Sequence, residues 1–183
     1  AALHAAGLPE NVIDAAKAIQ SDTGLSEHDL FQPGALQAET LVDLVAKYSG
    51  QWPLERHIHL VLLFSGEGGA AKALLSMGQG WVATTFDKND SDIQNVLSVV
   101  GCLLATWQIR SAVPHATAWM SPDCDPWLSF ITKAGSMRDV HGVEIVGDYN
   151  NDWVNTANET AFVVAWFIFR AFLDDIYIGL EQP

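Results

Sequence analysis

The spacing of apolar residues divides the chain into two parts of different character. In the first part, one stretch repeats apolar residues at the i, i+3, i+4, i+7 spacing of a helix with a single buried face: Leu41, Leu44, Val45 and Tyr48. An earlier helix is expected from Pro9 to about Ser21, because proline suits the first turn of a helix. Residues 1–50 are therefore predicted to form a helical N-terminal extension, with only a short turn near Phe31 between its helices.

From residue 57 onward, apolar runs alternate with helical patterns. Strands are predicted at 57–64, 81–86, 116–120 and 176–180, and the first is a continuous apolar run typical of a strand covered on both faces. Helices are predicted from Gly69 to Met77, from Asp90 or Ser91 through Val100 and at 155–173, and a long loop is predicted at 131–152. The stretch 102–109 is ambiguous, and its pattern favours a helix. Such alternation predicts an α/β fold with a parallel sheet and right-handed crossovers.

The composition supports a folded domain and restricts its partners. The chain has 183 residues, of which 49% are hydrophobic, so it can build a substantial core. Nine basic and 22 acidic residues give a net charge of −13, which disfavours nucleic acid, because that affinity comes largely from Lys and Arg. The longest apolar run, 161–173, is shorter than the ~20 residues of a membrane span, so we expect no transmembrane segment. A protein partner in a larger assembly is compatible with this charge.

Candidate site residues follow the predicted strands. After the first strand comes a glycine-rich turn that lets a ligand approach the backbone beside a helix N-terminus, formed by Phe64, Ser65, Gly66, Glu67, Gly68 and Gly69. Asp87 follows the second strand, 21 residues after Gly66, a spacing at which an acid can accept hydrogen bonds from ribose hydroxyls. Because ligands bind beyond the carboxyl ends of such strands, we predict that Gly66 and Asp87 lie together.

These motifs resemble those of C5-cytosine methyltransferases, which use S-adenosylmethionine (SAM). The turn Phe64-x-Gly66-x-Gly68-Gly69 is similar to the first motif of that family, and Asp87 stands where the family has its ribose-binding acid. Pro122-Asp123-Cys124 resembles the loop that carries the family's nucleophile, and Leu180-Glu181-Gln182 the strand end that carries its Glu-Asn motif. The chain is also similar to uncharacterised methyltransferase-like proteins of dinoflagellates, through Trp127, 135–136, 147–148, Asn158 and 181–183.

The resemblance implies a fold, a cofactor and a set of roles. Residues 51–183 would form a Rossmann-like, mostly parallel sheet of the class I methyltransferase type, incomplete at the C-terminus. SAM would contact the first motif and Asp87. Cys124 would be the nucleophile that adds to C6 of a flipped-out cytosine, and Glu181 would hold the base.

Other features of the sequence argue against catalysis. Asp123 and Asp125 flank Cys124, and their negative charge disfavours a thiolate by raising its pKa. The later motifs of the family have no counterpart, and the net charge opposes DNA. Two interpretations therefore stay open: a SAM-binding methyltransferase-like domain, or a non-catalytic structural or accessory subunit docked into a larger, for example organellar, complex.

The cysteines and histidines add little chemistry. Cys102 and Cys124 are too few for a disulfide framework and favour a reducing intracellular or organellar compartment over secretion. His57 and His59 share one strand face, but no third ligand is evident, so no metal site is predicted.

Overall fold

A four-stranded parallel sheet forms the centre of the molecule. The structure is a computed structural model that describes residues 2–52, 55–66, 68–78, 80–122 and 152–181. Its strands are β1 (Ile58–Leu63), β2 (Ala83–Phe86), β3 (Ala112–Met120) and β4 (Tyr177–Leu180), in the order β2-β1-β3-β4. Every pair is parallel, which confirms the predicted α/β, Rossmann-like fold in the described part of the chain.

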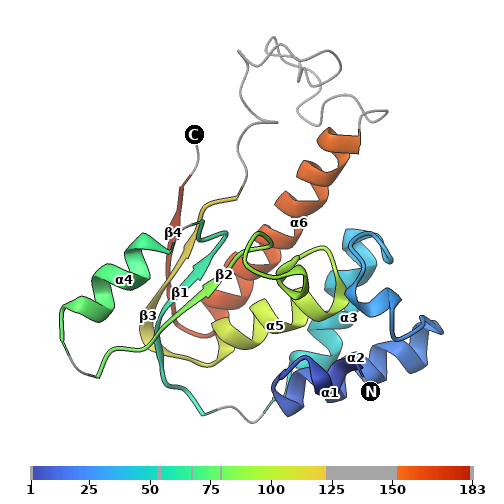
Figure 1. The fold of residues 1–183 in the computed structure, drawn as a ribbon, viewed down its shortest axis with the longest axis horizontal. Coiled ribbons are helices and arrows are strands. Elements are labelled where there is room, and N and C mark those ends of the chain that lie inside the picture. Colours follow the sequence, from blue (N-terminus) through green and yellow to red (C-terminus); the bar gives the residue numbers. More distant parts are fainter. Residues whose placement is uncertain (1, 53–54, 67, 79, 123–151, 182–183) are drawn as a thin grey trace.

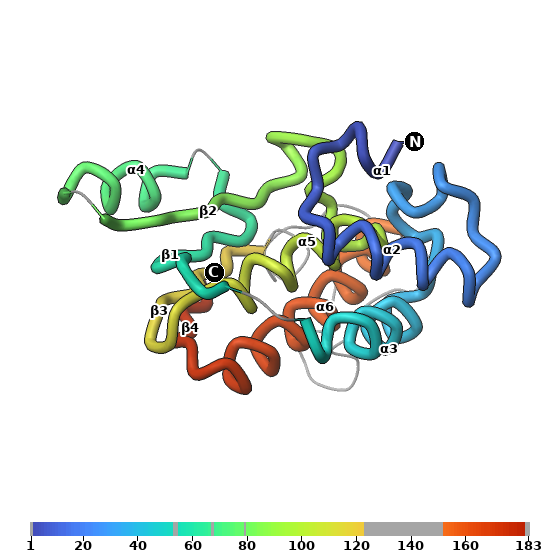
Figure 2. Tube along the Cα trace, turned by 90° about the horizontal axis from the view of Figure 1, so that it is seen from below, coloured from blue at the N-terminus to red at the C-terminus, as the bar shows by residue number. Residues whose placement is uncertain are grey.

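Helices cover the two faces of the sheet unequally. The short helix α4 (Gly69–Ser76) packs on β1 and β2 on one face, while α5 (Val99–Arg110) and α6 (Asp152–Leu173) cover the other face (Figures 1 and 2). This is the arrangement expected of right-handed crossovers that run in opposite directions from β1. The face of β3 and β4 on the α4 side therefore has no described helix over it.

The N-terminal helices form a further layer outside α5 and α6. They are α1 (Ala2–Ala5), α2 (Glu10–Thr23) and α3 (Ala38–Ser49), joined by the short 3-10 helix η1 (Asp29–Phe31). Gly24 ends α2 in the left-handed conformation, and its N–H donates to the carbonyl of Gln20. The predicted helices before residue 50 are thus confirmed, and the division at residues 1–50 and 51–183 stays a prediction because both parts share one hydrophobic core.

Helix α5 is the centre of that core. It is apolar all round, which suits a helix enclosed by the sheet on one side and by α2, α3 and α6 on the others. Its own Leu103 shares the core with buried side chains from the N-terminal helices, the sheet and α6, namely Val12, Ile19, Leu41, Val45, Val61 and Phe167. The Cys102 thiol is buried here, and burial raises its pKa, so it stays protonated and unreactive.

The helix predicted from Asp90 or Ser91 through Val100 is wrong in part. Only the 3-10 helix η2 (Asp92–Gln94) forms there, Asn95 is extended, and α5 begins at Val99. The Asn95 side chain accepts a hydrogen bond from the Leu97 N–H, and Ser98 donates to the Asn95 carbonyl while accepting from Gly101 N–H. Such local bonds compete with a helical backbone, and they make Ser98 the N-cap of α5.

The other predicted elements occur with shifted ends. Strand β3 begins four residues before the predicted 116–120, β2 begins at Ala83 rather than residue 81, and α6 begins at Asp152. The ambiguous stretch 102–109 is helical, as expected. Residues 131–151 of the predicted long loop lie outside the described residues, and no described helix is both long and apolar enough to cross a membrane.

Candidate functional site

The sheet grows outwards from β1 in both directions: the chain first places β2 on one side of β1 and then returns to place β3 on its other side. The chain leaves β1 towards α4 on one face and enters β3 from α5 on the opposite face. Such a reversal leaves a crevice beyond the carboxyl ends of the strands, where open parallel sheets bind ligands. Phe64 and Gly66 after β1, Asp87 after β2 and Ser121 after β3 lie at this edge.

The turn after β1 needs glycine at particular places. Gly66 and Gly68 adopt positive φ values of 50° and 64°, which residues with side chains rarely adopt. A Cβ on Gly68 would also lie 3.3 Å from Cγ2 of Thr85 on the neighbouring strand. Gly69 then begins α4, so the motif makes a tight strand-to-helix turn at the carboxyl edge of the sheet.

Asp87 lies against that turn, as the sequence predicts. It follows β2 directly, is 7% exposed, and its Oδ2 accepts a hydrogen bond of 2.9 Å from the Gly66 N–H. Its Oδ1 accepts another from the Asn89 N–H, also at 2.9 Å, and its own N–H donates to Oε1 of Gln94. These contacts hold the carboxylate in one orientation, and each oxygen keeps a second acceptor position for a ligand hydroxyl.

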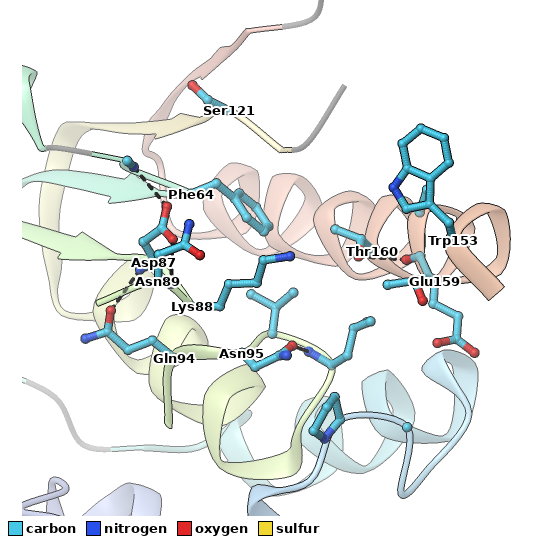
Figure 3. Close-up of a pocket in the computed structure, with 17 residues that line it drawn as sticks. Phe64, Asp87, Lys88, Asn89, Gln94, Asn95, Ser121, Trp153, Glu159 and Thr160 are labelled. Atoms are coloured by element: carbon cyan, nitrogen blue, oxygen red, sulfur yellow. Dashed lines mark hydrogen bonds between the residues drawn. The ribbon is translucent and has the colours of Figure 1, made fainter. Parts of the chain in front are cut away.

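A cavity of 560 Å³ opens above this contact (Figure 3). Three of its lining residues follow strands, namely Phe64 after β1, Asp87 after β2 and Ser121 after β3. Its volume lies within the ~300–1,000 Å³ range of small-molecule sites. Further walls come from the segment between β2 and α5, from the first turns of α6, and from Pro33 and Gly34 of the N-terminal extension.

The lining mixes aromatic, amide and charged groups. Phe64, just after β1, and Trp153 of α6 contribute rings, and Asn89, Gln94 and Asn95 contribute amides. Among the described lining residues, Lys88 carries the one basic side chain, and Asp87 and Glu159 carry the two acids. This mixture suits a ligand with an aromatic base, several hydroxyls and a charged tail.

A smaller cavity of 290 Å³ lies beside the first, on the α4 side of the sheet. Glu181 lines it at the end of β4, together with Trp119 and with Ala70 of α4. The indole Nε1 of Trp119 donates to Ser121 Oγ at 3.1 Å, and Ser121 Oγ donates to Glu181 Oε2 at 3.0 Å. The two cavities share Phe64, Gly66 and Ser121 as a common wall, so ligands in the two would be neighbours.

The structure brings some of the predicted site residues together and leaves others apart. Phe64, Gly66 and Asp87 line the larger cavity, whereas Gly68 and Gly69 shape the turn and line neither cavity. Glu181 lies in the smaller cavity, and Cys124 lies outside the described residues. The roles of all seven residues stay predictions.

Several lining residues were missed by sequence reasoning. Pro33 and Gly34 belong to a segment in which no chemistry was evident, and the Gly34 N–H donates to the Leu97 carbonyl to hold that loop against the cavity. Lys88 is the one that its position in the sequence could have indicated, because it directly follows Asp87, the acid at the end of the second strand.

His59 in β1 and His57, directly before β1, both have local partners. His59 Nδ1 accepts from the Val82 N–H, and His57 Nδ1 lies 3.0 Å from the Glu55 carbonyl oxygen. Within the described ranges, no group of three or more His, Cys, Asp or Glu side chains converges to hold a metal.

Comparison with known proteins gives no match: no protein-family model, no curated protein and no solved structure matches this chain. Function is therefore inferred from the motifs and the geometry of the site.

Proposed function

We propose that this chain is a methyltransferase-like domain that binds SAM in the 560 Å³ cavity at the carboxyl edge of its sheet. The observation that carries the proposal is the hydrogen bond between the Gly66 N–H and Asp87 Oδ2. It joins the first motif to the strand-end acid, two features that resemble the SAM site of C5-cytosine methyltransferases, and both line the cavity.

In this proposal each group has a distinct task. Asp87 accepts hydrogen bonds from the ribose hydroxyls, the turn at Gly66 lets the ligand approach the backbone, and Phe64 contacts its apolar parts. The sulfonium of SAM is a cation, and the acidic balance of the chain favours a positively charged ligand over a polyphosphate nucleotide. The smaller cavity at Glu181 shares a wall with this site, which suits an acceptor molecule beside the methyl donor.

Calorimetric titration of the chain with SAM and S-adenosylhomocysteine tests this function. We expect saturable binding of both ligands and no binding of ATP under the same conditions. Absence of binding at millimolar SAM would count decisively against the proposal.

A matched pair of variants connects the binding to the site. Asp87→Asn should weaken SAM binding by about tenfold to a hundredfold, because hydrogen bonds to a charged group contribute about 1.5–3 kcal/mol. Asp90→Asn removes an exposed acid three residues away that does not line the cavity, and it should leave the affinity unchanged. Equal effects of the two substitutions would show that general charge, and not Asp87, determines binding.

A second candidate function is an accessory subunit docked into a larger protein assembly. A group of exposed apolar side chains near the end of α4 and the start of β2 favours it: Leu75, Met77, Trp81 and Val82. Trp and Met are residues that protein interfaces prefer. Purification of the tagged chain from its native cells should then recover a defined complex, and Met77→Glu should release the chain from it; a free monomer that transfers methyl groups would exclude this candidate.

A further inference from the structure

Exposed apolar side chains gather on α6 and on the neighbouring strand β4, and together they are called the β4–α6 surface. It consists of Phe162, Phe169, Phe172, Leu173, Ile178 and Leu180, all of them exposed. Phe162, Phe169 and Leu173 follow one another at i, i+7 and i+11, so they form a stripe along one side of the helix. The buried side chains of α6, among them Val163, Phe167 and Ala171, lie on its opposite side.

Strand β4 is the edge of the described sheet. It pairs with β3 on one side, and no described strand pairs with its other side. The register places Ile178 beside Ala118 and Leu180 beside Met120, both of which are buried under the helices on the α5–α6 face. Figure 2 shows α6 next to β4 at the end of the sheet opposite β2, so the helix and the side of β4 without a described partner lie at the same end of the sheet.

The size of this β4–α6 surface is that of an interface. A whole aromatic side chain has an area of about 150–250 Å². The six residues are each partly exposed, Phe172 the most at 73%, and together they present roughly 600 Å² of apolar area to solvent. That lies at the upper end of the ~300–600 Å² found for the largest patch of a monomer. Together with the backbone of β4 it approaches the ~800 Å² that each partner buries in a stable complex.

The charge on the surface favours a particular occupant. From Phe162 to Leu173 the one charged residue is Arg170, and its Nε is paired with Asp174 at 2.7 Å. In a two-fold interface each patch meets its own copy, so a helix stripe without acids places no like charges against each other in a chain of charge −13. The stripe on α6 has this property.

We propose that a second copy of this chain covers the β4–α6 surface. A two-fold axis perpendicular to the sheet pairs β4 with β4 of the copy in antiparallel orientation and continues the sheet across the interface. The same axis keeps α6 of both copies on one face of that sheet and brings their apolar stripes together. One symmetric contact thus satisfies both the edge of β4 that has no described partner strand and the exposed helix stripe.

Two acids at the ends of β4 make this dimer sensitive to salt. Asp175, with a side chain 71% exposed, precedes the strand, and the exposed Glu181 follows it. Antiparallel pairing brings Asp175 of one copy towards Glu181 of the other, and salt screens the repulsion between them. The dimer should therefore be tighter in 0.5 M than in 0.05 M NaCl, because the Debye length, ~10 Å at 0.1 M, shortens as salt rises.

Sedimentation equilibrium of the whole chain tests the proposal. The wild type should sediment at about twice the 19.9 kDa of one chain. Phe172→Glu, on the proposed interface, should raise the dimer dissociation constant by at least about tenfold, because it places a charge in an apolar contact. Met77→Glu is the matched control: Met77 is 78% exposed and lies just after α4, away from the β4–α6 surface, so this variant should dimerise like the wild type.

A second variant tests the strand separately. Ile178→Lys should also produce a monomer, because charged side chains on an edge strand oppose pairing, and circular dichroism checks that both variants stay folded. A wild type that remains a monomer at about 100 μM, well above the micromolar range of ordinary association, would overturn the proposal. Equal dissociation constants for Phe172→Glu and Met77→Glu would also overturn it. So would association that weakens as salt rises, because that would indicate an oppositely charged partner instead of a copy. None of these results depends on SAM binding.

Discussion

At the scale of single residues, the site depends on the turn after β1 and the acid that holds it. The positive φ of Gly66 and Gly68 sets the direction of the backbone, and the Asp87 carboxylate fixes that backbone through the Gly66 N–H. Because Asp87 also accepts from Asn89 N–H, its position does not depend on a ligand. The site is therefore formed without a ligand, which would lower the cost of the proposed SAM binding.

Gly68→Ala tests whether the shape of the turn matters for binding. The substitution forces a Cβ into a left-handed conformation, at a cost of about 1–2 kcal/mol, and places it against Thr85. Gly24→Ala is the control, because Gly24 has a similar φ of 74° at the end of α2 and no atom near its missing Cβ. We expect thermal unfolding to show a similar loss of stability in both variants, while calorimetry shows weaker SAM binding in Gly68→Ala alone; weaker binding in both variants would contradict this role of the turn.

At the scale of elements, the segment before α5 forms a wall of the cavity and is packed unusually tightly on that helix. A Cβ on Gly101 of α5 would lie 1.9 Å from the backbone oxygen of Asn95, a residue of the cavity wall. The close approach explains why a glycine occurs inside a buried helix. The helix and the cavity wall are thus fixed to each other.

Gly101→Ala should destabilise the fold by about 1–3 kcal/mol, the cost of overpacking a core, although alanine is the better helix former. Gly69→Ala at the start of α4 is the control, because nothing lies near its missing Cβ and its φ is not positive. Denaturant unfolding should show a clear loss for Gly101→Ala and little change or a gain for Gly69→Ala. Equal stability of Gly101→Ala and the wild type would show that the segment can move away from α5.

The sequence predicts the elements better than the connections between them. Strand β1 and helix α6 are recognisable because their apolar runs are long, and the adjacency of Gly66 and Asp87 follows from a general property of parallel sheets. The helix expected to include Ile93 and Val96 fails because the side chains of Asn95 and Ser98 bond to nearby backbone, which periodicity does not register. The contribution of Pro33 and Gly34 to the cavity depends on how a distant segment packs, and no local pattern contains that information.

At the scale of the whole molecule, one buried carboxylate ties distant segments together at the end of the sheet opposite the cavity. Asp174, between α6 and β4, pairs with Arg56 before β1 at 2.9 Å and with Arg170 of α6 at 2.7 Å. Arg110 at the end of α5 lies 3.9 Å away, and burial together with the neighbouring Arg170 lowers the pKa of its guanidinium. Three arginines thus share one acid, which makes this acid important for stability.

Asp174→Asn should destabilise the fold by about 3–5 kcal/mol, because it leaves partly buried guanidinium groups without a counter-charge. Asp175→Asn is the control: this neighbouring acid has a largely exposed side chain, and asparagine tolerates its positive φ of 60°. Thermal unfolding should separate the two variants clearly. Similar melting temperatures would mean that the arginines are stabilised by groups other than Asp174.

The most direct test of the account is a crystal structure of the chain grown with saturating S-adenosylhomocysteine. The account predicts density for the adenosyl group in the cavity above the turn at Gly66, with both ribose hydroxyls within hydrogen-bond distance of the Asp87 carboxylate. A cavity that stays empty at saturating ligand, or a ligand bound away from Asp87, would contradict it.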